Sequence, residues 1–319
     1  MNSLVYHYML RPPTSIWYQT ELTAFDELIL SWNCPRPAQG ALLFSISVLT
    51  QEWSPFFSYA LWGWSTQKSF SFENTEVFAY QDIVRIKSGR ATGFKIKIEA
   101  LEGAKLTEIG LHVCCSLLAG FKRDSVRGIY FSTSTLPIPC QSQMALSHPR
   151  NQSMCSPTST AAVVTFLTRR SISPLGFAHA VYDHGFDIYG NWALNVAQAA
   201  SHLGTAWQCW VERLSGFDGL LAKLKQGLPL VVSVKGDLPG APVPYQAGHL
   251  IAIRGYDLGR EKVLCMDPAY PKDEETYVEY DLADFLPAWE ARQYLAYVFD
   301  RPLHKSKSCP CPKSYLCAI

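Results

Sequence analysis

Alternating hydrophobicity constrains the first third of the chain more than any other feature. From Phe25 to about Ser116, apolar residues fall mostly at every second position, as in residues 94–98 and 109–113. This period is typical of half-buried strands, and no long helical period interrupts it. Turn-forming residues such as Pro35-Arg36-Pro37 separate the segments. The pattern predicts an all-β sandwich domain, which we place at residues 1–121 and which could be a binding module.

The tryptophans of this β-rich part allow two interpretations. Exposed indole rings can form a platform that stacks on a sugar or a peptide, but packing in the core is their commoner use. A glycan or a protein ligand on the β domain therefore stays one hypothesis. The residues concerned are Trp17, Trp32, Trp53, Trp62 and Trp64.

Length and composition indicate an ordinary globular protein of two domains. The chain has 319 residues, more than one hydrophobic core usually serves, with 48% hydrophobic and 17% charged residues. A net charge of +1 with scattered Lys and Arg residues argues against nucleic acid as a partner. No signal peptide is visible and no apolar run is long enough to span a membrane. We expect a cytoplasmic protein, or one exported by a signal-less route.

The remaining two thirds divide into three parts. Residues 122–147 have weak periodicity and contain Pro137-Ile138-Pro139, which predicts a linker and lead-in. Residues 148–303 form a second domain, and residues 304–319 a tail that we expect to be disordered. The ten cysteines show no disulfide framework. Because the tail supplies three thiols, at 309, 311 and 317, and not four ligands, no metal site is expected there.

The second domain is predicted to be α+β, with helices first and then an antiparallel sheet. Ser156 as N-cap and Pro157 in the first turn predict a helix that follows Cys155. Asn191 can cap a second helix. The predicted helices run to about 170, from 192 to 202 and from 216 to 226, and the predicted strands cover 230–234, 249–256, 262–266 and 296–299.

Cys155 is the candidate nucleophile. At a helix N-terminus, unpaired N–H groups and the helix dipole stabilise a thiolate and can lower a cysteine pKa from about 8.5 to roughly 3.5–7.5. The alternative is that Cys155 is a buried structural cysteine. Whether the chain also supplies a base for this thiol decides between the two interpretations.

Two such partners lie on a predicted hairpin. If the hairpin is centred on Leu258, His249 pairs with Asp267, and directly opposed residues have Cβ atoms about 4.5–5.5 Å apart. A carboxylate at that distance can fix the tautomer of an imidazole. Together with Cys155 they make a nucleophile, a base and an orienting group.

These residues carry a close resemblance. Cys155-Ser156-Pro157-Thr158-Ser159, Gly190-Asn191-Trp192, Gly248-His249-Leu250 and Asp267-Pro268-Ala269 resemble the motifs of papain-like cysteine peptidases of family 39, in the stand-alone C39-like branch with a β-rich domain in front. The resemblance implies a papain-like domain with Cys155 as nucleophile, His249 as general base and then acid, and Asp267 as orienting group. It also suggests Gly190, Asn191, Trp192 and Gly248 as substrate contacts.

In such enzymes a glutamine upstream of the cysteine helps to form the oxyanion hole. Gln143 fits the surrounding pattern, although residues 145–151 form an insertion before Cys155. Gln152 and Gln141 remain as alternatives.

The sequence therefore predicts a hydrolase that cleaves a peptide or amide bond through an acyl-thioester on Cys155. The triad needs no metal and no other cofactor, so none is expected. Two alternatives stay open. One is acyl or peptidyl transfer, in which an amine replaces water, and the other is a binding protein whose peptidase domain is vestigial.

Overall fold

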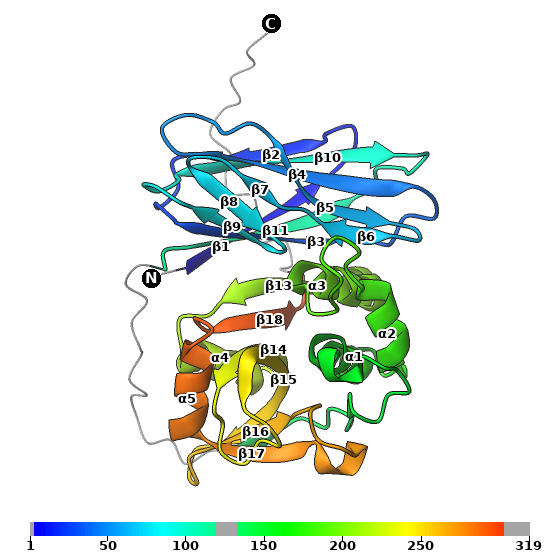
Figure 1. Ribbon diagram of the computed structural model, residues 1–319, viewed down its shortest axis with the longest axis vertical. Helices are drawn as coiled ribbons and strands as arrows, with labels where there is room; N and C mark the ends of the chain where they lie inside the picture. Colours follow the sequence, from blue (N-terminus) through cyan, green and yellow to red (C-terminus); the bar gives the residue numbers. More distant parts are fainter. Residues whose placement is uncertain (1–2, 119–132, 303–319) are drawn as a thin grey trace, which may run out of the picture.

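The first part of the chain forms two antiparallel sheets. In this computed structural model, which describes residues 3–118 and 133–302, they lie as stacked layers above the rest of the molecule (Figure 1). The six-stranded sheet has the order β1 (Ser3–Leu10), β11 (Ile109–Ser116), β3 (Glu27–Asn33), β9 (Ile83–Ile86), β8 (Val77–Tyr80) and β7 (Phe72–Glu73). The five-stranded sheet has the order β2 (Ile16–Gln19), β10 (Gly93–Leu101), β4 (Ala41–Leu49), β5 (Phe57–Gly63) and β6 (Gln67–Ser69).

Aromatic side chains fill the space between these sheets. The ring of Trp32 on β3 stacks on Phe44 of β4 with centroids 4.5 Å apart, and it meets Trp62 of β5 edge-on at 6.1 Å. Trp17, Trp32 and Trp62 are buried, whereas Trp64 is 62% exposed. Three of the five tryptophans are therefore core residues. A stacking platform would have to rest on Trp53 and Trp64 alone.

The second part is built on a seven-stranded antiparallel sheet with helices on both faces (Figure 1). Helices α1 (Cys155–Thr168), α2 (Pro174–Val181) and α3 (Trp192–Leu203) cover one face, and α4 (Phe217–Lys225) and α5 (Leu282–Glu290) cover the other. The strand order is β13 (Gln208–Arg213), β18 (Leu295–Asp300), β14 (Leu230–Gly236), β15 (Tyr245–Asp257), β16 (Lys262–Met266) and β17 (Tyr277–Asp281), with β12 (Thr133–Thr135) also paired to β15. Short 3-10 turns occupy Asn151–Ser153, Gly204–Ala206 and Asp273–Glu275.

Most predicted helices and strands of this part are confirmed, although they begin and end at other residues than predicted. Asn191 caps α3 as expected, because its Oδ1 accepts from the Leu194 N–H at 3.0 Å. The N-cap of α1 is Met154 and not Ser156, whose hydroxyl instead lies 2.8 Å from that of Tyr297. The structure adds α2, α5, β13 and β17, which the sequence pattern did not predict. Residues 122–132 and 304–319 lie outside the described residues.

The two parts share an interface of hydrogen bonds between β3 and β13. Asn33 donates to the Cys209 carbonyl at 2.7 Å and accepts from its N–H at 2.9 Å. Glu27 on β3 forms a buried ion pair with Arg213 on β13. One hydrophobic cluster also contains core residues of both parts. The interface therefore holds the β-rich part against α3 and β13. Within the described ranges, no helix has the length and apolarity that a membrane crossing requires.

Candidate active site

Cys155 is the first residue of α1 and is partly exposed. The helix packs against β15, where the Ser159 hydroxyl donates to the Leu250 carbonyl at 2.9 Å. This contact places the N-terminal turn of α1 beside the residue that follows His249. N–H groups of a first helical turn have no partner within the helix, so they are free to stabilise negative charge there.

The environment of Cys155 favours its thiolate. Burial raises the pKa of this thiol, while the charge of His249 and a hydrogen bond from its ring lower it. Backbone N–H groups of Leu250 and Ser156 act in the same direction. The net result is a thiol pKa below its ordinary value.

His249 lies on β15 and is buried between the sulfur and a carboxylate. Its Nε2 donates to Asp267 Oδ1 at 2.7 Å, which leaves Nδ1 as the ring nitrogen that serves Cys155. The ring of Tyr245 stacks on the imidazole with centroids 4.0 Å apart and an angle of 20°. Burial lowers the pKa of His249, but the negative charges of Asp267 and Cys155 raise it to about 10. The arrangement therefore favours a thiolate–imidazolium ion pair at neutral pH.

Asp267 directly follows β16 and is completely buried. Its Oδ1 accepts from His249 and from the Ala269 N–H at 3.0 Å, and its Oδ2 accepts from the hydroxyls of Tyr245 and Tyr280, each at 2.7 Å. Burial raises the pKa of this carboxyl, but the charge of His249 and these hydrogen bonds bring it below its ordinary value. Asp267 is therefore a fixed anion with four donors.

The hairpin register differs from the predicted one. In the structure Ile253 pairs with Cys265, and this register continues to place Asp267 opposite Ile251. The prediction that His249 stands directly opposite Asp267 is wrong by two residues. Because two is an even number, both side chains still point to the same face, and diagonal neighbours remain within reach.

The cause of this shift lies in the strand and in its turn. A bulge between Ile253 and Gly255 leaves Arg254 without a paired residue on β16, and the turn of the hairpin covers residues 258–261. A simple alternation of residues carries no signal for a bulge.

Gln143 connects the two loops that flank the site. Its backbone N–H donates to the Pro268 carbonyl at 2.9 Å. Its buried side chain donates through Nε2 to the carbonyls of Asn151 at 3.1 Å and Gln152 at 2.8 Å, in the turn before Cys155. Its Oε1 is buried without a hydrogen-bond partner among the described residues. Both N–H bonds of the amide are thus directed to carbonyls, and the role of Gln143 in the oxyanion hole stays a prediction.

The four suggested substrate contacts have different surroundings. Asn191 is buried and its side chain donates to the Asp183 carboxylate at 2.9 Å, so this side chain has a structural role. Trp192 is 7% exposed, and Gly190 faces open space. Gly248 has φ +95°, a conformation that favours glycine, directly before His249. Their contact with a substrate stays a prediction.

Tyr245 and Tyr280 are the site residues that sequence reasoning missed. Tyr280 lies on β17, which was not predicted, and Tyr245 lies at the start of β15, before the predicted strand. Tyrosines are frequent core residues, so only the position of their hydroxyls on Asp267 identifies them.

In the described part of the chain, the possible metal ligands form no metal-binding cluster and the cysteines form no disulfide. No group of three or more His, Cys, Asp or Glu residues there could hold a metal ion. The seven cysteines in that part are free thiols. The C-terminal cysteines lie outside it.

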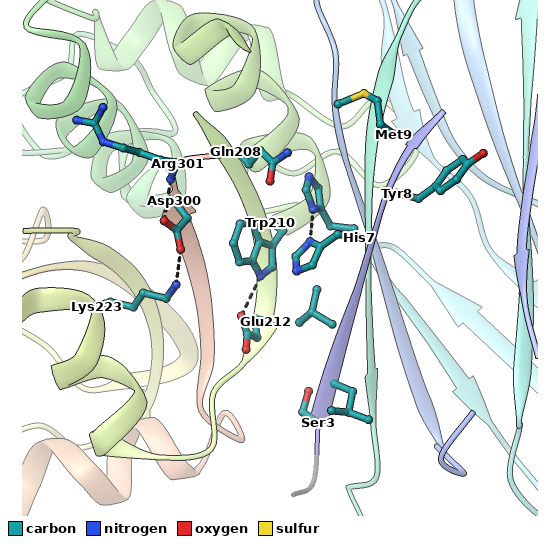
Figure 2. A pocket seen from close by; sticks show the side chains of 13 residues that line it. Ser3, His7, Tyr8, Met9, Gln208, Trp210, Glu212, Lys223, Asp300 and Arg301 are labelled. Carbon is teal, nitrogen blue, oxygen red and sulfur yellow. Dashed lines mark hydrogen bonds and ion pairs between the residues drawn. The ribbon is translucent and has the colours of Figure 1, made fainter. Parts of the chain in front are cut away.

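A separate cavity of about 500 Å³ lies between β1 and the strands β13 and β18 (Figure 2). His7 and His112 face each other there with their Nδ1 atoms 2.6 Å apart, beside Trp210. Lys223 and Asp300 close one side of the cavity with an ion pair of 2.6 Å. Cys155, His249 and Asp267 do not line this cavity.

Comparison with known proteins identifies the family of this chain. Residues 135–297 match the Peptidase_C39 like family. A crystal structure of a candidate C39-like peptidase from Bacillus anthracis is similar over 53% of this chain and 98% of its own, with 16% identity and a TM-score of 0.41. The comparison with curated proteins found no significant match. Because the family match spans half of the chain, the protein belongs to the Peptidase_C39 like family.

Proposed function

We propose that the protein is a papain-like cysteine hydrolase that cleaves a peptide or amide bond through an acyl-thioester on Cys155. The contact series from Cys155 through His249 to the buried Asp267 carries this proposal. In this proposal residues 148–303 are the papain-like domain, residues 1–121 a β sandwich, and residues 122–147 the lead-in between them.

The first half of the reaction uses the ion pair. The thiolate of Cys155 attacks the carbonyl carbon of the scissile bond and forms a tetrahedral intermediate. His249 then gives its Nδ1 proton to the leaving nitrogen, the C–N bond breaks, and an acyl-thioester remains on the sulfur. His249 is neutral at the end of this step.

The second half restores the enzyme. Neutral His249 accepts a proton from a water molecule, and the oxygen of that water attacks the thioester carbonyl. The C–S bond breaks, the acid product is released, and the thiolate–imidazolium pair forms again. Asp267 keeps its charge throughout and holds Nε2, so that Nδ1 faces the sulfur.

Two groups are candidates for stabilising the oxyanion. One is the backbone N–H of Cys155 at the start of α1, and the other is the side chain of Gln143. Gln143 would have to turn one N–H from the carbonyl of Asn151 or Gln152 towards the substrate. Gln143→Glu keeps the size of the side chain but removes both donors, so its kinetics separate loss of a donor from loss of packing.

Labelling and turnover in matched variants test the function. Iodoacetamide at neutral pH should modify Cys155 first, and Cys155→Ala should abolish cleavage of a fluorogenic peptide library. Cys140→Ala is the control, because Cys140 is another partly exposed thiol outside the triad. Cleavage that survives in Cys155→Ala, or faster labelling of Cys140, would refute the proposal. Products formed with an added amine decide between hydrolysis and transfer.

A further inference from the structure

Arg292 lies close to the residue that precedes the catalytic imidazole. It belongs to the turn between α5 and β18. A Cβ atom placed on Gly248 would lie 3.5 Å from the Arg292 Cζ and 3.8 Å from its Nη1. The Nε donates to the Ser233 hydroxyl at 3.0 Å, and Cζ lies 5.3 Å from the ring centroid of Trp192. The guanidinium therefore stands where β14, β15 and the start of α3 meet.

Most hydrogen-bond donors of this guanidinium have no acceptor among the described residues. An arginine offers five N–H bonds, and among the described residues only the one on Nε has an acceptor. The carboxylates in its neighbourhood have other partners. Glu27 pairs with Arg213 and Arg85, and Asp82 accepts from the Trp192 N–H at 2.6 Å. No carboxylate in the described part lies within ion-pair distance of Arg292.

The surroundings of Arg292 make an unpaired charge costly. The side chain is half-buried, and burial together with Arg213 lowers the pKa of the guanidinium, while Asp82 and Glu27 act against this from a distance. A partly desolvated cation gains from a directly bonded anion. Two free Nη groups in one plane match the two oxygens of a carboxylate.

We propose that Arg292 selects substrates that carry a carboxylate close to the scissile bond, which makes it a specificity-determining residue. The inference rests on the proposed function, because it is Gly248 next to His249 that brings the guanidinium to the site. Glycine at this position also leaves Arg292 uncovered, since any side chain at 248 would begin in contact with the guanidinium. The carboxylate can belong to an Asp or Glu side chain or to a peptide C-terminus.

Matched peptides separate these sources. Each peptide carries Asp, Asn or Lys at one position near the cleavage site, and each is made with a free or an amidated C-terminus. For the unchanged protein we expect one of two comparisons to show a preference: Asp peptide against Asn peptide, or free C-terminus against amidated C-terminus. In that comparison kcat/KM should be about 10- to 100-fold higher for the peptide with the carboxylate, which is the effect of a hydrogen bond between charged groups. A preference for Asp over Asn identifies a side-chain carboxylate. A preference for free acid over amide identifies the C-terminus.

Variants of Arg292 test the assignment. Arg292→Gln should bring this ratio close to one, Arg292→Lys should keep part of it, and Arg292→Glu should favour Lys-containing peptides. If Arg292 has only a structural role, its variants should lose kcat/KM equally for all peptides. Labelling of Cys155 by iodoacetamide, a reagent without a carboxylate, controls for folding of each variant.

The outcomes distinguish the two proposals. Equal rates for acid and amide peptides in the unchanged protein, or an unchanged ratio in Arg292→Gln, would overturn the role of Arg292 while peptide cleavage stands. If Cys155 is unreactive and no peptide is cleaved, both proposals fail.

Discussion

Replacing His249 by alanine should move the pKa of the Cys155 thiol from below to above its ordinary value. The charge of His249 is the main influence that offsets burial at this sulfur. Two opposite charges about 4 Å apart interact by about 4 kcal/mol at an effective dielectric constant of about 20, so the imidazolium strongly favours the thiolate. Without the imidazolium, burial remains and continues to raise the pKa.

The pH dependence of alkylation measures this change. The rate of iodoacetamide labelling at Cys155, followed by mass spectrometry of the modified peptide, should level off below pH 8.5 in the unchanged protein. In His249→Ala the rate should still rise about tenfold per pH unit through neutrality, because each unit multiplies the small thiolate fraction by ten. The position of the midpoint is the readout, since nucleophilicity itself changes with pKa.

The pH dependence of stability provides a second signature. The pKa of His249 is raised to about 10, so its contribution to the free energy of unfolding is complete below about pH 6.5 and is lost as pH rises through 10. His249→Ala should remove this alkaline decline. An identical labelling midpoint in the unchanged protein and in His249→Ala would show that the ion pair does not exist.

Three further changes test separate parts of the structure. Tyr280→Phe removes one donor from the buried Asp267 carboxylate, and it should lower the free energy of unfolding by about 1.5–3 kcal/mol in urea titrations; no change would mean that this hydroxyl is dispensable. Gln143→Ala should lower kcat about 10²–10³-fold with little effect on KM, and the opposite result, a loss in Gln152→Ala only, would assign the oxyanion hole to the closer glutamine. Glu27→Ala leaves the buried Arg213 without its partner and should cost about 3–5 kcal/mol by the same titration, whereas a change under 1 kcal/mol would contradict the buried ion pair.

The sequence predicts several helices and strands well because interactions between neighbouring residues determine them. A cap at Asn191 and alternation in residues 94–98 are signals contained in a few neighbouring residues, and the structure has a helix and a strand there. Helix α1 begins at Cys155, two residues earlier than a Ser156 N-cap would place its start. Each of these predictions depends on interactions within one element.

The remaining features depend on contacts between distant segments. The register of the hairpin depends on a bulge at Arg254, which no local pattern indicates. Helix α5 contains Pro287, a residue that sequence rules place outside helix interiors, and it buries Phe285 and Trp289. The tyrosine hydroxyls on Asp267 come from β15 and β17, so only the assembled sheet brings them together.

The most direct test of the account is to trap the acyl-enzyme. The protein is mixed with a peptide ester that acylates Cys155 faster than water hydrolyses the thioester. The reaction is then quenched in acid, and the protein is analysed by intact mass and peptide mapping. We predict a mass increase equal to the acyl group, located on Cys155 and absent in Cys155→Ala. Turnover without any adduct on Cys155, or an adduct on another residue that disappears when that residue is replaced, would contradict the proposed mechanism.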